Sequence, residues 1–182
     1  MREADAPAPP QVLSVDFVAR SHGLFIFGIR RDYVGTEKPE FAAFAGKIAS
    51  SYYGGGGYVL NIAFSDGAAV RRNLLAHDGM VLRQAIARED TKEPGFAAHV
   101  FQCVLSDSNQ NGMLDHEDRS TLILVRPDLS GDDLRIEDAE SFSALSRDQL
   151  LVETGRGSET RFWVIDAETF GKQEIAWGGT RE

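Results

Sequence analysis

A possible site for a hard cation lies between residues 107 and 118, which read DSNQNGMLDHED. Oxygen-bearing side chains stand at positions 1, 3, 5, 9 and 12 of this stretch, with Gly112 at position 6 and the aliphatic Leu114 at position 8. A chain that wraps calcium must point alternate side chains inward, turn sharply where positive φ is tolerated, and close with an acid. The stretch therefore predicts a calcium loop. The other interpretation is a polar turn between two strands, because Asn and Gly are common turn formers.

The remaining candidates for chemistry are weaker. The four histidines, at positions 22, 77, 99 and 116, are scattered and show neither HExxH nor another paired spacing, which argues against a catalytic zinc site. No GxSxG motif accompanies the serines. The single Cys103 lies in an apolar run and is expected to be a buried hydrophobe. We therefore predict no catalytic residues.

Composition sets the class of protein. A chain of 182 residues with 42% hydrophobic and 26% charged residues is typical of one soluble globular domain. The net charge of −9 argues against a nucleic-acid partner, and no apolar run approaches the roughly 18 residues of a membrane span. Residues 1–10, rich in Pro and Ala, are expected to be a flexible linker before a single all-β domain over residues 11–182.

The elements that must position the loop are predicted to be short strands. Alternating or continuous apolar runs between turn signals predict twelve of them. The predicted strands cover residues 11–18, 24–29, 58–64, 69–75, 80–87, 97–105, 121–128, 134–136, 141–146, 149–153, 161–165 and 173–177. The run 24–29 is nearly continuously apolar, which is typical of a strand covered on both faces. One short helix is expected in the insertion 32–57, where Phe41, Phe44 and Ile48 follow Pro39 at helical spacing.

The strands fall into three repeats of four, near residues 11–76, 79–137 and 141–177. In each repeat the third strand is an apolar run followed by Asp and Gly, at residues 60–67, 122–131 and 162–171. This pattern resembles the blades of WD-type and Tol-type β-propellers, although the Gly-His and Trp-Asp signature is missing. The resemblance implies three four-stranded antiparallel blades. A propeller closes with about four to eight blades. Either a second copy completes the ring as a homodimer, or the strands form a β-sandwich or small barrel.

The calcium loop resembles that of EF-hand proteins, and more closely the dockerin variant with Asp in the closing place. The resemblance implies six ligands: the side chains of Asp107, Asn109, Asn111, Asp115 and Asp118, and the backbone carbonyl of Met113. Asp115 is expected to bind directly or through water. Strands replace the flanking helices, so a calcium-sensor role is not expected. Asn at two ligand positions predicts weak affinity, and the 12-residue wrap favours calcium over magnesium.

These observations favour a non-enzymatic, propeller-like binding or scaffolding module in which calcium is a structural staple. Its partner would be an unknown protein or glycan. A weak site would stay empty in the cytosol, so a periplasmic or extracellular location is expected. The alternative is an extracytoplasmic hydrolase acting on glycan or peptide. Its site would lie where the insertions 32–57 and 107–119 meet, since both join the second and third strands of a repeat.

Overall fold

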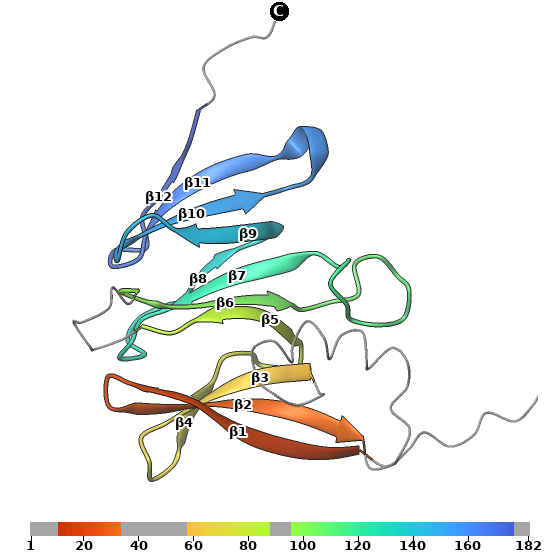
Figure 1. The fold of residues 1–182 in the computed structure, drawn as a ribbon, viewed down its shortest axis with the longest axis vertical. Coiled ribbons are helices and arrows are strands. Elements are labelled where there is room, and N and C mark those ends of the chain that lie inside the picture. The colour runs from red at the N-terminus through yellow and green to blue at the C-terminus, as the bar shows by residue number, and fades with distance from the viewer. Residues whose placement is uncertain (1–10, 34–57, 88–95, 177–182) are drawn as a thin grey trace, which may run out of the picture.

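The computed structural model describes residues 11–33, 58–87 and 96–176 of the chain, which form twelve strands in three antiparallel sheets (Figure 1). The first sheet consists of β1 (Gln11–Ser21), β2 (Leu24–Tyr33), β3 (Tyr58–Ser65) and β4 (Val70–Asn73). The second consists of β5 (Met80–Ala85), β6 (His99–Val104), β7 (Ser120–Val125) and β8 (Leu134–Ile136). The third consists of β9 (Ala139–Ala144), β10 (Gln149–Thr154), β11 (Arg161–Asp166) and β12 (Lys172–Glu174), with a 3-10 turn, η1 (Gly157–Glu159), between β10 and β11.

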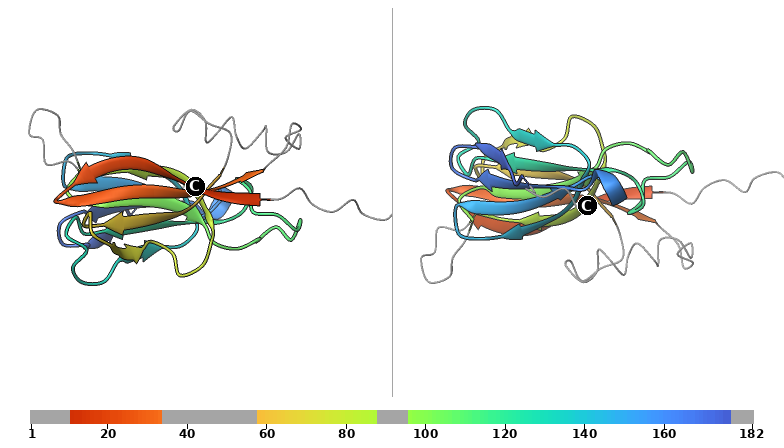
Figure 2. Two further views of the ribbon diagram at one scale, coloured as in Figure 1. Left: turned by 90° about the horizontal axis from the view of Figure 1, so that it is seen from below. Right: turned by 90° about the horizontal axis from the view of Figure 1, so that it is seen from above.

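Each sheet is a simple meander, because its four strands lie side by side in chain order. The predicted all-β class, the twelve strands and their grouping into three four-stranded antiparallel sheets are confirmed. The described sheets form an open stack and not a closed barrel (Figures 1 and 2). The closed propeller ring therefore stays a prediction. The predicted linker over residues 1–10 and the short helix in the insertion 32–57 lie outside the described residues.

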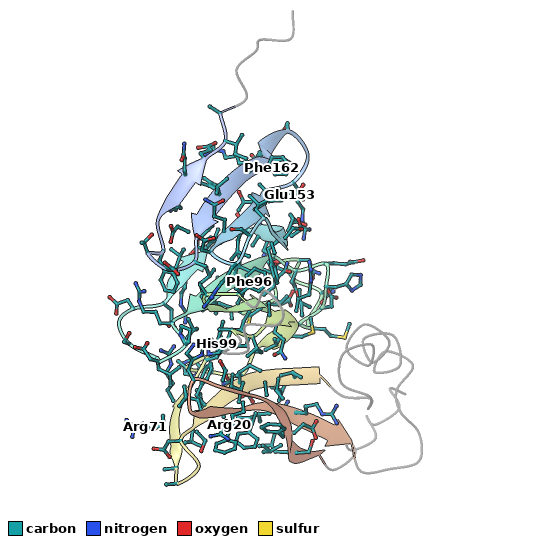
Figure 3. All side chains as sticks on the ribbon, turned by 60° about the vertical axis from the view of Figure 1, so that its left-hand side comes forward. Arg20, Arg71, Phe96, His99, Glu153 and Phe162 are labelled. Carbon is teal, nitrogen blue, oxygen red and sulfur yellow. The ribbon has the colours of Figure 1, made fainter. Side chains whose placement is uncertain are left out.

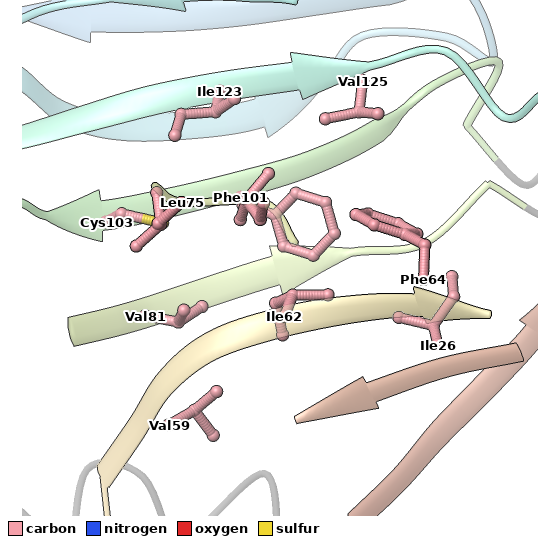
Figure 4. Close-up of a cluster of buried hydrophobic side chains, with 11 residues drawn as sticks. Ile26, Val59, Ile62, Phe64, Leu75, Val81, Phe101, Cys103, Ile123 and Val125 are labelled. Atoms are coloured by element: carbon pink, nitrogen blue, oxygen red, sulfur yellow. The ribbon is translucent and has the colours of Figure 1, made fainter. Parts of the chain in front are cut away.

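The second sheet is covered on both faces, which explains why its central strands are almost entirely apolar. On β7 the side chains of Ile123 and Val125 face the first sheet, whereas Leu122 and Leu124 face the third. We call the contact between the first and second sheets the first interface, and the contact between the second and third sheets the second interface. Figure 4 shows the buried cluster of the first interface, in which Phe101 is fully buried.

The run 24–29 differs from its prediction in one respect. Ile26 is fully buried in the first interface, but Phe25 and Phe27 point to the opposite face, where no other described sheet covers them. The sequence pattern predicted that both faces of this strand are covered, but the described residues cover only the inner face.

Turn chemistry accounts for the tight hairpins. Asp66 accepts hydrogen bonds from the backbone N–H groups of Ala68 and Ala69 through Oδ1, at 2.9 and 3.0 Å, which closes the turn between β3 and β4. The pKa of Asp66 is lowered by these hydrogen bonds, with Arg71 adding to the effect. The fourth strand of each sheet is the shortest, with four residues in β4 and three in β8 and β12. No helix in the described part of the chain is long and apolar enough to span a membrane.

Candidate calcium loop

The predicted calcium loop joins β6 to β7 and projects from one edge of the sheet stack (Figure 1). Residues 155–160 make the corresponding connection in the third sheet, between β10 and β11. Both connections link the second and third strands of their sheets. Hydrogen bonds described below join the two connections, so they lie side by side at the same edge.

Asp107, at the first position of the loop, organises the turn that follows it. Its Oδ1 accepts a hydrogen bond from the N–H of Asn111 at 3.1 Å, and its Oδ2 accepts one from the N–H of Gly112 at 2.7 Å. Gly112 has φ +87°, and no atom lies within 4 Å of where a Cβ would stand. The loop therefore requires glycine at its sixth position for backbone conformation and not for space.

The amide side chains at the third and fifth positions fold back onto the loop in the same way. Asn109 accepts a hydrogen bond from the N–H of Asn111 at 3.0 Å, and Asn111 accepts one from the N–H of Met113 at 2.9 Å. An amide or carboxylate oxygen has two lone pairs. The oxygens of Asp107, Asn109 and Asn111 each accept one of these hydrogen bonds and keep capacity for a second interaction.

Asp118, at the last position, accepts hydrogen bonds from backbone N–H groups at both ends of the loop. Its side chain is buried, with the residue 1% exposed, and its Oδ1 accepts hydrogen bonds from the N–H groups of Ser108 and Asn109 at 2.7 and 3.0 Å. Its Oδ2 accepts one from the N–H of Asp115 at 3.0 Å. Burial raises the pKa of Asp118, but the hydrogen bonds from Asp115, Asn109 and Ser108 together lower it below the ordinary value. The ionised carboxylate thus ties the start of the loop to its end.

Asp115 accepts hydrogen bonds from the side-chain amides of the loop. Its Oδ2 accepts a hydrogen bond from Nδ2 of Asn111 at 2.7 Å, and its Oδ1 accepts one from the N–H of Glu117 at 2.8 Å. A longer contact of 3.4 Å joins Oδ1 to Nδ2 of Asn109. These hydrogen bonds hold Asp115, at the ninth position of the loop, close to Asn109 and Asn111 at the third and fifth positions.

The six predicted ligand residues therefore share one hydrogen-bonded loop, but its carboxylates are not gathered at one point. No group of three or more His, Cys, Asp or Glu side chains that could hold a metal ion occurs in the described ranges. Half of the predicted ligand set is neutral: the amides of Asn109 and Asn111, and the carbonyl of the exposed Met113. The donors are all oxygen, which fits calcium chemistry. Calcium stays a prediction for this loop.

The end of the loop is bound to the third sheet by Arg156, which precedes η1. Its guanidinium donates hydrogen bonds to the carbonyls of Glu117 and Asp118, at 3.1 and 3.4 Å, and to the carboxylate of Glu140 on β9 at 2.5 Å. Next along the chain, Arg119 forms an ion pair with Asp138 at 3.1 Å. The conformation of the loop is therefore coupled to the second interface.

A cavity of about 190 Å³ lies between the loop and the third sheet. Its lining includes Arg83, Gln102, His116, Glu140 and Arg156. Gln102 donates hydrogen bonds to the carbonyls of Ala139 and Glu140 from Nε2, so it also pins β9 to the second sheet. Most of the residues that line the cavity have polar or charged side chains.

The sequence reasoning missed the contributions of Ser108 and Arg156. Ser108 stands at the second position of the loop, where the template asks for nothing, yet its Oγ accepts a hydrogen bond from the N–H of Arg119 at 2.7 Å. Arg156 is far from the loop in the sequence, and no local pattern marks it. The insertion 32–57, predicted to share this edge, has only its first two residues in the described part of the chain.

Comparison with known proteins adds no relative. No protein-family model, no curated protein and no solved structure matches this chain.

Proposed function

We propose that this chain is a calcium-stabilised, non-enzymatic module of propeller-like sheets that binds or scaffolds a protein or glycan partner outside the cytoplasm. Calcium would act as a structural staple in the loop 107–118. Two properties of this loop support the proposal. It has the spacing of a calcium loop, and its end is hydrogen-bonded to the third sheet through Arg156.

Electrostatics supplies the physical reason for a cation. Four acidic residues, Asp107, Asp115, Glu117 and Asp118, stand within twelve positions of a chain that already carries a net charge of −9. Hydrogen bonds from N–H groups offset part of their repulsion. A bound calcium ion would offset more of it, and ordering of the loop would then contribute to folding stability.

The side chains of Asp107, Asn109 and Asn111 would hold the ion through the oxygens that keep acceptor capacity. The carbonyl of Met113 would complete that side. Asp118 would close the site through Oδ2, which accepts one hydrogen bond, since Oδ1 already accepts three. Asp115 holds the amides of both asparagines and would thereby orient their oxygens.

The partner-binding surface would be the edge from which the loop projects. That edge brings together the loop, the connection at residues 155–160 and the cavity between them. A connection that is ordered by a metal and anchored to a sheet is a suitable platform for recognition, because less conformational entropy is lost when a partner binds.

Thermal unfolding with and without calcium tests the proposal. At about ten times the dissociation constant, a ligand stabilises the native state by about 1.4 kcal/mol, which raises the Tm of a domain of this size by about 3–6 °C. The wild-type chain should show this rise with calcium, and a smaller one with magnesium. Asp107→Ala and Asp118→Ala should abolish it.

Asp132→Ala is the matched control, because it removes one negative charge outside the loop. Both loop variants also lose hydrogen bonds, so the quantity to compare is the difference in Tm with and without calcium and not the Tm itself. A calcium-dependent rise that survives in Asp107→Ala would mean that the loop is not the binding site. Absence of any rise in the wild-type chain would overturn the proposal.

A further inference from the structure

The outer face of the first sheet, on the side away from the second sheet, is apolar and exposed. On β1 the alternating residues Leu13, Val15 and Phe17 are 62%, 62% and 60% exposed, and Val70 on β4 is 60% exposed. Phe17 lies opposite Phe27 on β2, with ring centroids 5.9 Å apart in an edge-on arrangement. Contiguous apolar patches of this kind on a soluble protein mark interaction sites.

Two observations favour a sheet as the partner of this exposed face. Sheets of the same chain cover both faces of the second sheet and the inner face of the first. The run 24–29 also has the continuous apolar pattern of a strand with two covered faces, yet only its inner face is covered in the described chain. The outer face of the first sheet, which carries Leu13, Val15 and Phe17, therefore resembles one half of a sheet-to-sheet interface.

The other end of the stack offers a matching surface. On the outer face of the third sheet, Leu151 on β10 lies opposite Val164 on β11, and Glu153 lies opposite Phe162. Their neighbours Leu150 and Val152 point the other way, into the second interface. Figure 3 shows Arg20 on the first sheet at one end of the stack and Glu153 and Phe162 on the third sheet at the other.

We propose that a second copy of this chain covers these faces, so that the outer face of the first sheet of each copy packs on the outer face of the third sheet of the other. Charge complementarity supports this pairing over a contact between like faces. Arg20, on the first face, is exposed and lies over the ring of Phe25 at 5.5 Å. Glu153, on the third face, accepts a hydrogen bond from Oγ of Ser141 at 2.9 Å and forms no ion pair within the described ranges.

The area of the faces supports two contacts per pair. Four strands spaced about 4.8 Å apart and about six residues long present a face of about 400 Å². One contact between two such faces buries about 800 Å², which is below the roughly 1,000 Å² expected of a stable interface. Two contacts bury about 1,600 Å², the standard size for a specific complex. A pair that makes both contacts has two-fold symmetry and closes when the three sheets curve about one axis, as the blades of a propeller do, whereas a straight stack would continue as a filament through single contacts.

This inference concerns the arrangement of the sheets in the proposed module and does not depend on calcium. A failure of the calcium experiment leaves it intact, and its own failure leaves the loop proposal intact.

The first test is the mass of the full chain in solution by light scattering after gel filtration. Two copies of the 20.0 kDa chain are expected. Phe17→Asp should raise the dissociation constant at least about 100-fold, because it places a charge in the centre of the apolar contact. Leu145→Asp is the matched control, since Leu145 is 53% exposed but lies in the turn between β9 and β10. A monomeric wild-type chain, or an open filament, would overturn the proposal.

A charge-swap experiment tests which faces meet. Arg20→Glu places like charges in both contacts of a dimer, and so does Glu153→Arg. Each variant alone should dimerise at least about tenfold more weakly than the wild type. An equimolar mixture should recover a heterodimer, because both of its contacts again pair Arg with Glu.

Variants that retain the Tm of the wild-type monomer at low concentration report on association and not on folding. If Glu153→Arg alone leaves the dimer unchanged, or the mixture fails to recover it, the third sheet does not take part and the proposed pairing is wrong.

Discussion

The two interfaces of the sheet stack are held together in different ways. At the centre of the first, the rings of Phe64 and Phe101 lie edge-on at 6.0 Å beside the buried imidazole of His99. Ser21 donates a hydrogen bond to the carbonyl of Ala87, and Arg72 forms an ion pair with Asp133. The second interface has an apolar cluster too, but its polar contacts also hold the loop 107–118. Gln102 donates hydrogen bonds to carbonyls of β9, and Arg156 donates one to a carbonyl of the loop 107–118.

The two interfaces therefore contribute differently: the first mainly to stability, and the second to the relative position of the sheets. Apolar burial is non-directional and supplies most of the stability of the first interface. Hydrogen bonds have defined geometry, so those of the second interface set the position of the third sheet relative to the loop. Substitutions in the loop are therefore expected to alter the third sheet more than the first.

The largest expected effect is at the centre of the first interface. Phe101→Ala should lower the free energy of unfolding by about 3–5 kcal/mol, because it removes buried surface and leaves a cavity beside Phe64. Urea denaturation of the full chain measures it, and Leu145→Ala is the control at an exposed position outside the proposed contacts. A cost below about 1 kcal/mol would mean that this interface is not tightly packed.

An effect of intermediate size is expected from pH, through the one imidazole in the first interface. His99 is fully buried, and its Nδ1 accepts a hydrogen bond from the N–H of Ala87 at 3.1 Å. Desolvation lowers the pKa of His99 to about 4, and the charge of His22 adds to this, while the carbonyl of Pro127 opposes it. The folded protein therefore binds a proton on His99 less readily than the unfolded chain does.

The contribution of His99 to stability is complete above its unfolded pKa of about 6.5 and is lost as pH falls from there towards about 4. The loss by pH 4.5 should be about 2–3 kcal/mol in urea denaturation. His99→Asn, which keeps an acceptor for Ala87, should flatten this slope. The exposed His77→Asn should not. An unchanged slope in His99→Asn would assign the acid sensitivity to other groups.

The smallest effect is expected at the second interface. Gln102→Leu keeps the volume of the side chain but removes the donor to the carbonyls of Ala139 and Glu140, at a cost of about 1–3 kcal/mol. Hydrogen exchange should accelerate in β9 to β12 and remain unchanged in β1 to β4. Gln149→Leu, at an exposed position, should change neither. Equal acceleration in the first sheet would show that the two interfaces are not separable.

The strands and their grouping into sheets could be predicted from the sequence because each strand is specified by a local pattern of residues. The apolar run in β7 and the Asp-Gly turn after β3 each mark an element without reference to the rest of the chain. The loop could also be found, since its oxygen-bearing residues lie within twelve positions. The contacts of Gln102 and Arg156 could not, because they depend on how one sheet stacks on the next. The exposure of Phe17 could not either, since β1 has the same alternation as a covered strand.

The short fourth strands have a consequence for how this protein behaves when crowded. A sheet edge with unpaired N–H and C=O groups invites strands of other molecules to add to it. Here β4, β8 and β12 leave only three or four residues at that edge, and charged side chains such as Arg71, Arg135 and Lys172 stand on them. Strand addition at these three edges is therefore discouraged, which leaves the opposite edges, above all the 11-residue β1, as the places where a strand of another molecule could add.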